Sequence, residues 1–175
     1  MMCRNYLLNS YNIYNKYHKN KTNKIIHYIT VPLIIFSLFC MFNYIPYVKY
    51  GNDDFLFVNF VTVGLIVIYI TVYIIVDIGT GLTMLIPIYI FYFLASFYYY
   101  CFNHLIGFLI ITMIHIASWI TQILGHLVWE KNSPAFVHSF IQSFIMAPYF
   151  VVLELIFDAG YKTDLKRQLE GYEIY

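Results

Sequence analysis

Three of the six histidines stand where the apolar character of the chain is interrupted, and their side chains could bind a transition metal. His18 and His27 precede the first long uncharged run, and His126 follows the fourth together with Glu130. Imidazole and carboxylate donors suit a 2-His-1-carboxylate or histidine-rich Fe(II) site. A thiolate site is not indicated, because the three cysteines are scattered and form no CxxC pair.

Helix geometry limits which histidines can share one metal ion. In a continuous helix, His115 and His126 would lie about 16 Å apart at a rise of 1.5 Å per residue. They can share an ion only if the helix breaks near Gly125. One continuous helix would also place His18 and His27 on opposite sides, so they meet only if the polar KNKTN stretch between them supplies a turn.

Other polar residues near these histidines have narrower predicted roles. His104 is expected on the opposite membrane face and is excluded, whereas His138, which follows a Ser-Pro-Ala turn, stays open as a ligand. Asn23 and Gln122 are predicted to form hydrogen bonds with the ligand imidazoles, because metal-bound histidines usually bond a second partner through the other ring nitrogen.

The amino-acid composition of the whole chain is that of an integral membrane protein. Of its 175 residues, 61% are hydrophobic and 11% are charged, whereas soluble domains carry about 25% charged residues. A core of this size cannot hide so much apolar surface. Ten Lys and Arg against nine Asp and Glu give no field that would attract nucleic acid. We therefore predict a single all-α integral membrane domain, 1–175, built as a polytopic helical bundle.

Four uncharged runs are each long enough to cross about 30 Å of hydrocarbon as a helix. The predicted spans are 28–48, 55–76, 82–100 and 105–125. A further apolar segment, 140–157, is shorter and carries polar residues, which favours a re-entrant or interfacial C-terminal helix. Five full spans are the alternative. The polar, basic segment 1–27 and the polar tail 158–175 flank this bundle.

The predicted topology brings the candidate ligands to one face of the membrane. Four crossings return the chain to the side on which it began, so His18, His27 and His126 share that side. Glu130 lies one turn beyond His126 and points the same way if the helix continues. The positive-inside rule places both basic termini, and with them the site, on the cytoplasmic face.

Two segments carry patterns that match a known family. The segment YHKNKTNKIIHYITVPLIIFS has His18, Asn23, His27 and Pro32 at fixed spacing. The segment WITQILGHLVWEKNSPAFVHSFIQSFIMAPYFVVLE carries the second set, namely Trp119, Gln122, Gly125, His126, Glu130, Pro134, Ala135, Gln142, Ala147, Pro148 and Glu154. Together they resemble the signatures of the membrane-bound Fe(II)-dependent 2-hydroxy fatty acid dioxygenases. The chain departs from the family at Lys19, where some members have a second consecutive histidine.

The resemblance implies a function and a site. It implies that His18, His27 and His126 are ligands of Fe(II), with Glu130 as a further ligand or general base. The implied reaction is α-oxidation: a long-chain 2-hydroxy fatty acid and O2 give CO2 and a fatty acid one carbon shorter. In this family the reaction belongs to phytosphingosine breakdown in the endoplasmic reticulum membrane.

A lysine near the mouth of the site could hold the substrate carboxylate as a point charge, and Lys24 and Lys131 are the candidates. The acyl tail would then enter the aromatic-lined bundle.

Three other functional classes are the alternatives to this one. A non-catalytic lipid-binding or transport bundle would need an ionisable residue at mid-membrane, where only His115 qualifies, and no inverted repeat is visible. A bis-histidine haem protein would use His115 or His126 beside His27. The membrane di-iron class is excluded, because clustered HxxxH and HxxHH boxes are missing.

Overall fold

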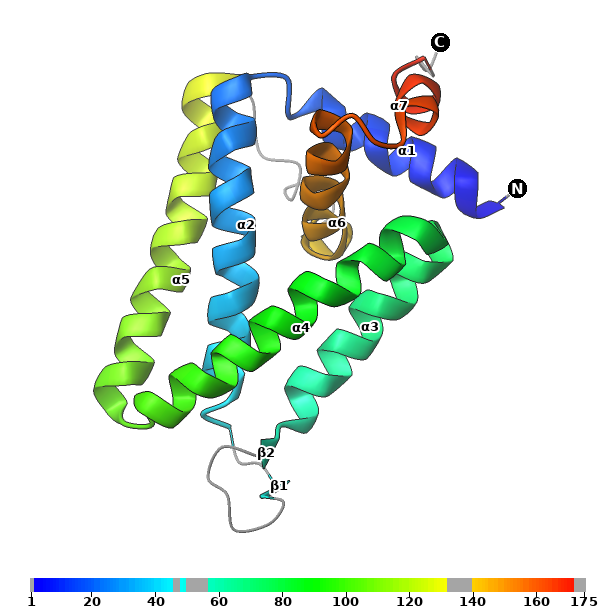
Figure 1. Cartoon of the computed structure of the whole chain (residues 1–175). Helices are drawn as coiled ribbons and strands as arrows, with labels where there is room; N and C mark the ends of the chain where they lie inside the picture. The colour runs from blue at the N-terminus through cyan, green and yellow to red at the C-terminus, as the bar shows by residue number, and fades with distance from the viewer. Residues whose placement is uncertain (1, 46–47, 50–56, 132–139, 172–175) are drawn as a thin grey trace.

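The computed structural model describes residues 2–45, 48–49, 57–131 and 140–171 (Figure 1). Within these residues the prediction of an all-α membrane bundle is confirmed. A short antiparallel ladder pairs β1 (Val48–Lys49) with β2 (Phe57–Val58). The helical elements are α1 (Met2–Lys16), α2 (Lys21–Phe42), α3 (Phe60–Val76), α4 (Ile78–Cys101), α5 (Leu105–Gly125), the π-helical segment η1 (His126–Glu130), α6 (Phe140–Asp158) and α7 (Thr163–Glu170).

Three helices are long and apolar enough to cross a membrane: α2, α4, and α5 with its continuation through η1. The apolar helix α3 has 17 residues and is shorter than a full span. The C-terminal helices form a pair, Phe144–Asp158 and Thr163–Glu170, that bends by 117°. This bend agrees with the re-entrant or interfacial C-terminal element predicted from the sequence.

The first span begins earlier than expected. We predicted a start at residue 28, but α2 begins at Lys21, because the Asn20 side chain caps the helix and accepts a hydrogen bond from the Thr22 N–H at 2.9 Å. The capped turn extends the helix through Asn23 and His27. Both residues therefore lie on the regular helix α2 rather than in a preceding loop.

The segment before α2 also forms a helix, although its composition is polar. Leu7, Leu8, Tyr11 and Tyr14 are buried along α1, which packs against α3, α6 and α7. Figure 1 shows α1 lying across the end of the bundle, beside α7. The segment that we read from the sequence only as polar and basic is thus part of the packed core.

The helices run alternately, and this order returns the chain to its starting end (Figure 1). Helices α2 and α5 lie antiparallel and pack along their length, and α3 and α4 form an inclined hairpin. The start of α2 and the end of α5 therefore meet. Many Ile, Leu and Phe side chains of α4 and α5 are exposed, as expected for surfaces that contact lipid.

Candidate metal centre

The structure brings His18, His27 and His126 together at the end of the bundle where α1, α2 and η1 meet. One ring nitrogen from each lies within 4.8 Å of the others, and the described residues contain no other such group of three metal-binding side chains. The ring centroids are 4.5 to 4.8 Å apart. All three side chains are buried, at 2% to 5% exposure.

The turn that the sequence required between His18 and His27 is present, whereas the helix of His115 and His126 does not break at Gly125 but continues as η1. Helix α1 ends at Lys16, and the chain turns before α2, so His18 folds back onto His27. Helix α5 ends at Gly125, and His126 begins the π-helical turn. π-Helical turns often occur at functional sites.

The remaining histidines do not join the group. His115 contacts Ser37 Oγ through Nδ1 at 2.8 Å, and its Nε2 accepts a hydrogen bond from Trp119. His104 caps α5 at the end opposite His126, where its Nδ1 accepts the Gly107 N–H. His104 thus lies at the opposite end of α5 from the histidine group, as expected. His138 lies outside the described residues.

Backbone carbonyls fix which nitrogen of His18 and of His27 is free. His18 Nδ1 lies 2.7 Å from the Tyr14 carbonyl, and His27 Nδ1 lies 2.9 Å from the Asn23 carbonyl. A carbonyl can only accept, so each Nδ1 carries the proton and each Nε2 keeps its lone pair. His126 lies beside the Tyr17 backbone, and its Nδ1 is the nitrogen left without a partner. The unpartnered nitrogen of His126 is therefore the opposite one from that of the other two rings.

The three free nitrogens are the atoms that fit a metal ion. His18 Nε2, His27 Nε2 and His126 Nδ1 are buried and have no hydrogen-bond partner among the described residues. Buried polar atoms are rarely left unsatisfied, because each one costs free energy. Burial, together with His27 and His126 nearby, holds the pKa of His18 well below its ordinary value. At neutral pH the His18 imidazole is therefore uncharged and can donate its lone pair.

Glu130, the fourth predicted ligand, lies outside the histidine group. Its Oε1 accepts hydrogen bonds from the Asn20 N–H at 2.7 Å and from Asn23 Nδ2 at 3.2 Å. Asn23 is fully buried and holds His27 through its backbone carbonyl rather than its side chain. Gln122 is also buried, and its backbone carbonyl accepts the His126 N–H.

Sequence reasoning missed the two tyrosines that support the histidines. Tyr14 stacks on His18 with ring centroids 4.0 Å apart, and its carbonyl orients that ring. The spacing of four residues between Tyr14 and His18 would have indicated this bond, had the end of α1 been known. The Tyr17 backbone lies beside His126, which is distant in sequence, and no local pattern predicts this proximity.

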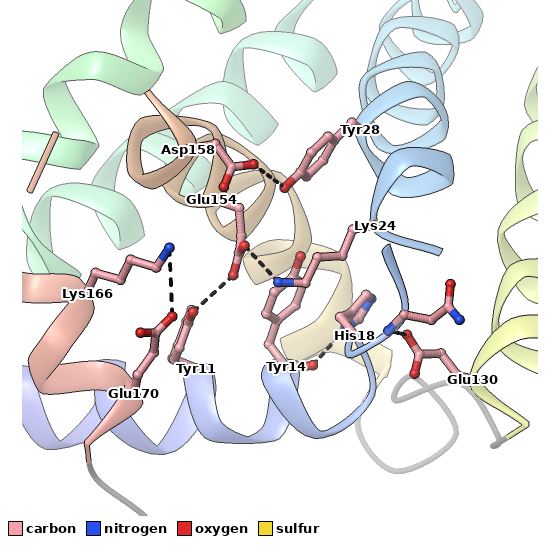
Figure 2. A network of polar contacts seen from close by, with 11 residues as sticks. Tyr11, Tyr14, His18, Lys24, Tyr28, Glu130, Glu154, Asp158, Lys166 and Glu170 are labelled. Carbon is pink, nitrogen blue, oxygen red and sulfur yellow. Dashed lines mark hydrogen bonds and ion pairs between the residues drawn. The ribbon is translucent and has the colours of Figure 1, made fainter. Parts of the chain in front are cut away.

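The two lysines suggested for the substrate carboxylate have different surroundings. Lys24 Nζ pairs with Glu154 Oε2 at 2.9 Å, and Tyr11 donates to Glu154 Oε1 at 3.0 Å (Figure 2). Lys131 is exposed and adopts a left-handed backbone conformation with φ of 52° directly after η1. Lys131 is thus open to an anion, while Lys24 would first have to leave Glu154.

Gly125 allows α5 to approach Asn23 closely, which leads to a testable prediction. A Cβ at Gly125 would lie 2.6 Å from Asn23 Oδ1. We expect Gly125→Ala to displace Asn23, disturb the carbonyl that holds His27, and weaken metal affinity by about tenfold. A titration with Co(II) measures this affinity. Gly64→Ala is the matched control, because a Cβ there meets nothing within 4 Å; equal affinities of the two variants would contradict the prediction.

Comparison with known proteins identifies the family of the chain. A family model described as "2-hydroxy-palmitic acid dioxygenase Mpo1-like" matches residues 5–159. The chain is 43% identical over 53 residues to 2-hydroxy-palmitic acid dioxygenase MPO1 of Saccharomyces cerevisiae. This match spans 30% of each protein. No solved structure matches the chain.

Proposed function

The chain belongs to the Mpo1-like family of 2-hydroxy-palmitic acid dioxygenases, and on this premise we propose that it is an Fe(II)-dependent dioxygenase of long-chain 2-hydroxy fatty acids. One observation carries the proposal: three buried histidines each place a ring nitrogen within 4.8 Å of the others, and each ring has one nitrogen without a hydrogen-bond partner. No hydrogen bond within the described residues uses these atoms.

The proposed reaction converts the substrate and O2 into CO2, water and a fatty acid one carbon shorter. His18, His27 and His126 would hold the ion. Fe(II), when bound, supplies Lewis acidity and redox chemistry toward O2. The carbonyls of Tyr14 and Asn23 keep His18 and His27 in the tautomers that leave the ligand nitrogens unprotonated.

The surroundings of the site suit an amphiphilic substrate. The site lies at one end of an apolar bundle, so the acyl chain can lie among the helices or in the lipid while the polar end reaches the histidines. We propose that exposed Lys131 attracts the substrate carboxylate, and that Lys24 remains with Glu154. We further propose that the protein resides in the endoplasmic reticulum with this end facing the cytoplasm, in accord with the basic residues of 16–24.

The proposal is tested with purified protein in lipid nanodiscs. Under air, the iron-loaded protein is expected to convert 2-hydroxypalmitate into pentadecanoate, with one CO2 released per product. Removal of iron with a chelator is expected to stop the reaction, and added Fe(II) to restore it. A folded protein that binds no iron would favour a non-catalytic lipid-binding or transport bundle. Iron binding without product would assign the site to another lipid substrate.

A further inference from the structure

We propose that Glu130 and Asn23 form a positioning pair that orients His27 and His126 through backbone carbonyls, and that Glu130 is not itself a metal ligand. The inference rests on the proposed metal centre and deepens it. In this inference the Glu130 carboxylate supports the histidine ligands and does not bind the metal itself. The metal-binding set within the described residues is then three imidazoles.

The contacts of Glu130 join two elements that carry ligands. Glu130 ends η1, the segment that begins with His126, and its Oε1 accepts bonds from Asn20 and Asn23 at the start of α2. Figure 2 shows Glu130 reaching the backbone just before α2. N–H groups at a helix start lack helical partners, and the helix dipole favours a negative charge there. The carboxylate therefore clamps η1 onto the helix that carries His27.

Asn23 connects this clamp to both rings. Its Nδ2 donates to Glu130 Oε1 at 3.2 Å and to the Tyr17 carbonyl at 3.4 Å. The Tyr17 backbone also lies beside His126, and the Asn23 carbonyl is the partner of His27. One fully buried residue thus faces His27 through its backbone carbonyl and bonds the Tyr17 carbonyl through its side chain. Because Nδ2 faces two acceptors, the orientation of the amide is fixed.

Loss of the clamp would loosen the ligands without removing one. Without the carboxylate, the Asn20 N–H would have no acceptor from η1, and Asn23 would keep only its longer bond to Tyr17. The π-helical turn would no longer be tied to α2 at Glu130. Substitution of residues that support metal ligands typically costs 10- to 100-fold in metal affinity.

The Glu130→Gln substitution distinguishes between two roles of Glu130, that of a positioning residue and that of a metal ligand. Both bonds that Glu130 accepts end on one oxygen, Oε1, and the glutamine amide retains that acceptor. A neutral amide, however, is a poor replacement for a carboxylate ligand. We therefore expect Glu130→Gln to lose less than tenfold in affinity, and Glu130→Ala to lose 10- to 100-fold. Asn23→Asp replaces the donor by an acceptor while keeping the side-chain shape, and we expect it to match Glu130→Ala.

The experiment is an anaerobic Co(II) titration of the full chain in nanodiscs, read from the visible cobalt bands. Their position and intensity report coordination geometry, and circular dichroism checks folding. Glu170→Ala is the control, because this exposed carboxylate on α7 pairs only loosely with Lys166, at 3.9 Å. It is expected to leave the cobalt spectrum and affinity unchanged.

The outcomes distinguish this inference from the function on which it rests. Strong binding by wild type and Glu130→Gln, with weak binding by Glu130→Ala and Asn23→Asp, would support the positioning pair. Equal loss in Glu130→Gln and Glu130→Ala, with altered cobalt bands in both, would overturn it in favour of a carboxylate ligand while leaving the metal centre intact. Wild type that binds no cobalt or iron would overturn both.

Discussion

Replacing His126 by alanine is expected to remove the bound iron and to reduce pentadecanoate formation by more than 100-fold, beyond the range of about 10- to 100-fold seen when only a supporting residue is lost. His126 is the one proposed ligand from the second half of the chain, and it closes the group formed with His18 and His27. Alanine leaves two imidazoles that cannot enclose the ion. Iron per protein and O2-dependent product formation measure the effect.

His104→Asn is the matched control for this variant. His104 caps α5 at the opposite end of the same helix, and asparagine is itself a preferred N-cap residue. The control is expected to retain both iron and activity. If His126→Ala kept its iron while His104→Asn did likewise, the three-histidine centre would be wrong.

Replacing Glu154 by alanine is expected to lower the free energy of unfolding by about 2–3 kcal/mol. Glu154 is 5% exposed, and its carboxylate binds Lys24 of α2 and Tyr11 of α1 (Figure 2). Its loss leaves the lysine charge and the tyrosine hydroxyl without these bonds. Buried pairs typically cost about 3–5 kcal/mol when one partner is removed, and the 25% exposure of Lys24 reduces that cost. Denaturant unfolding in detergent micelles measures the difference.

Two further substitutions test the cause of that loss. Glu154→Gln keeps an acceptor for Tyr11 but removes the charge that pairs with Lys24, so we expect an intermediate loss of stability. Asp164→Ala removes a fully solvated carboxylate that pairs with Arg167 at 3.7 Å on α7, and exposed pairs contribute about 0–1 kcal/mol. Similar unfolding free energies for Glu154→Ala and Asp164→Ala would show that the buried contacts of Glu154 stabilise the fold no more than an exposed ion pair does.

The sequence predicted the elements that depend on local composition, namely the apolar helices and the polar segments between them. Long uncharged runs indicate membrane helices, because lipid leaves no other partner for backbone polar groups. The polar interruptions indicated where the chain turns, and the turn before α2 lies in such a stretch. The start of α2 was less predictable, because it depends on the capping bond of Asn20.

The same reasoning found His18, His27 and His126, because each stands where an apolar run ends and helix topology returns these ends to one face. The contacts of Glu130 were less predictable. Its position one turn after His126 suggested a shared direction, but η1 is a π-helix, and the carboxylate instead meets Asn20 and Asn23. A change from α-helix to π-helix alters the direction of each later side chain, and no pattern in the sequence predicted this change.

By itself, the sequence determined that the chain is a helical membrane bundle with three histidines at one end, since hydropathy and spacing act along the chain. Only the tertiary structure decided which ring nitrogens are free, which carbonyls orient them, and that Lys24 and Tyr11 meet at Glu154. These features depend on contacts between residues as far as 143 positions apart. Such contacts are set by how helices pack in three dimensions, and packing leaves no periodic signal in the sequence.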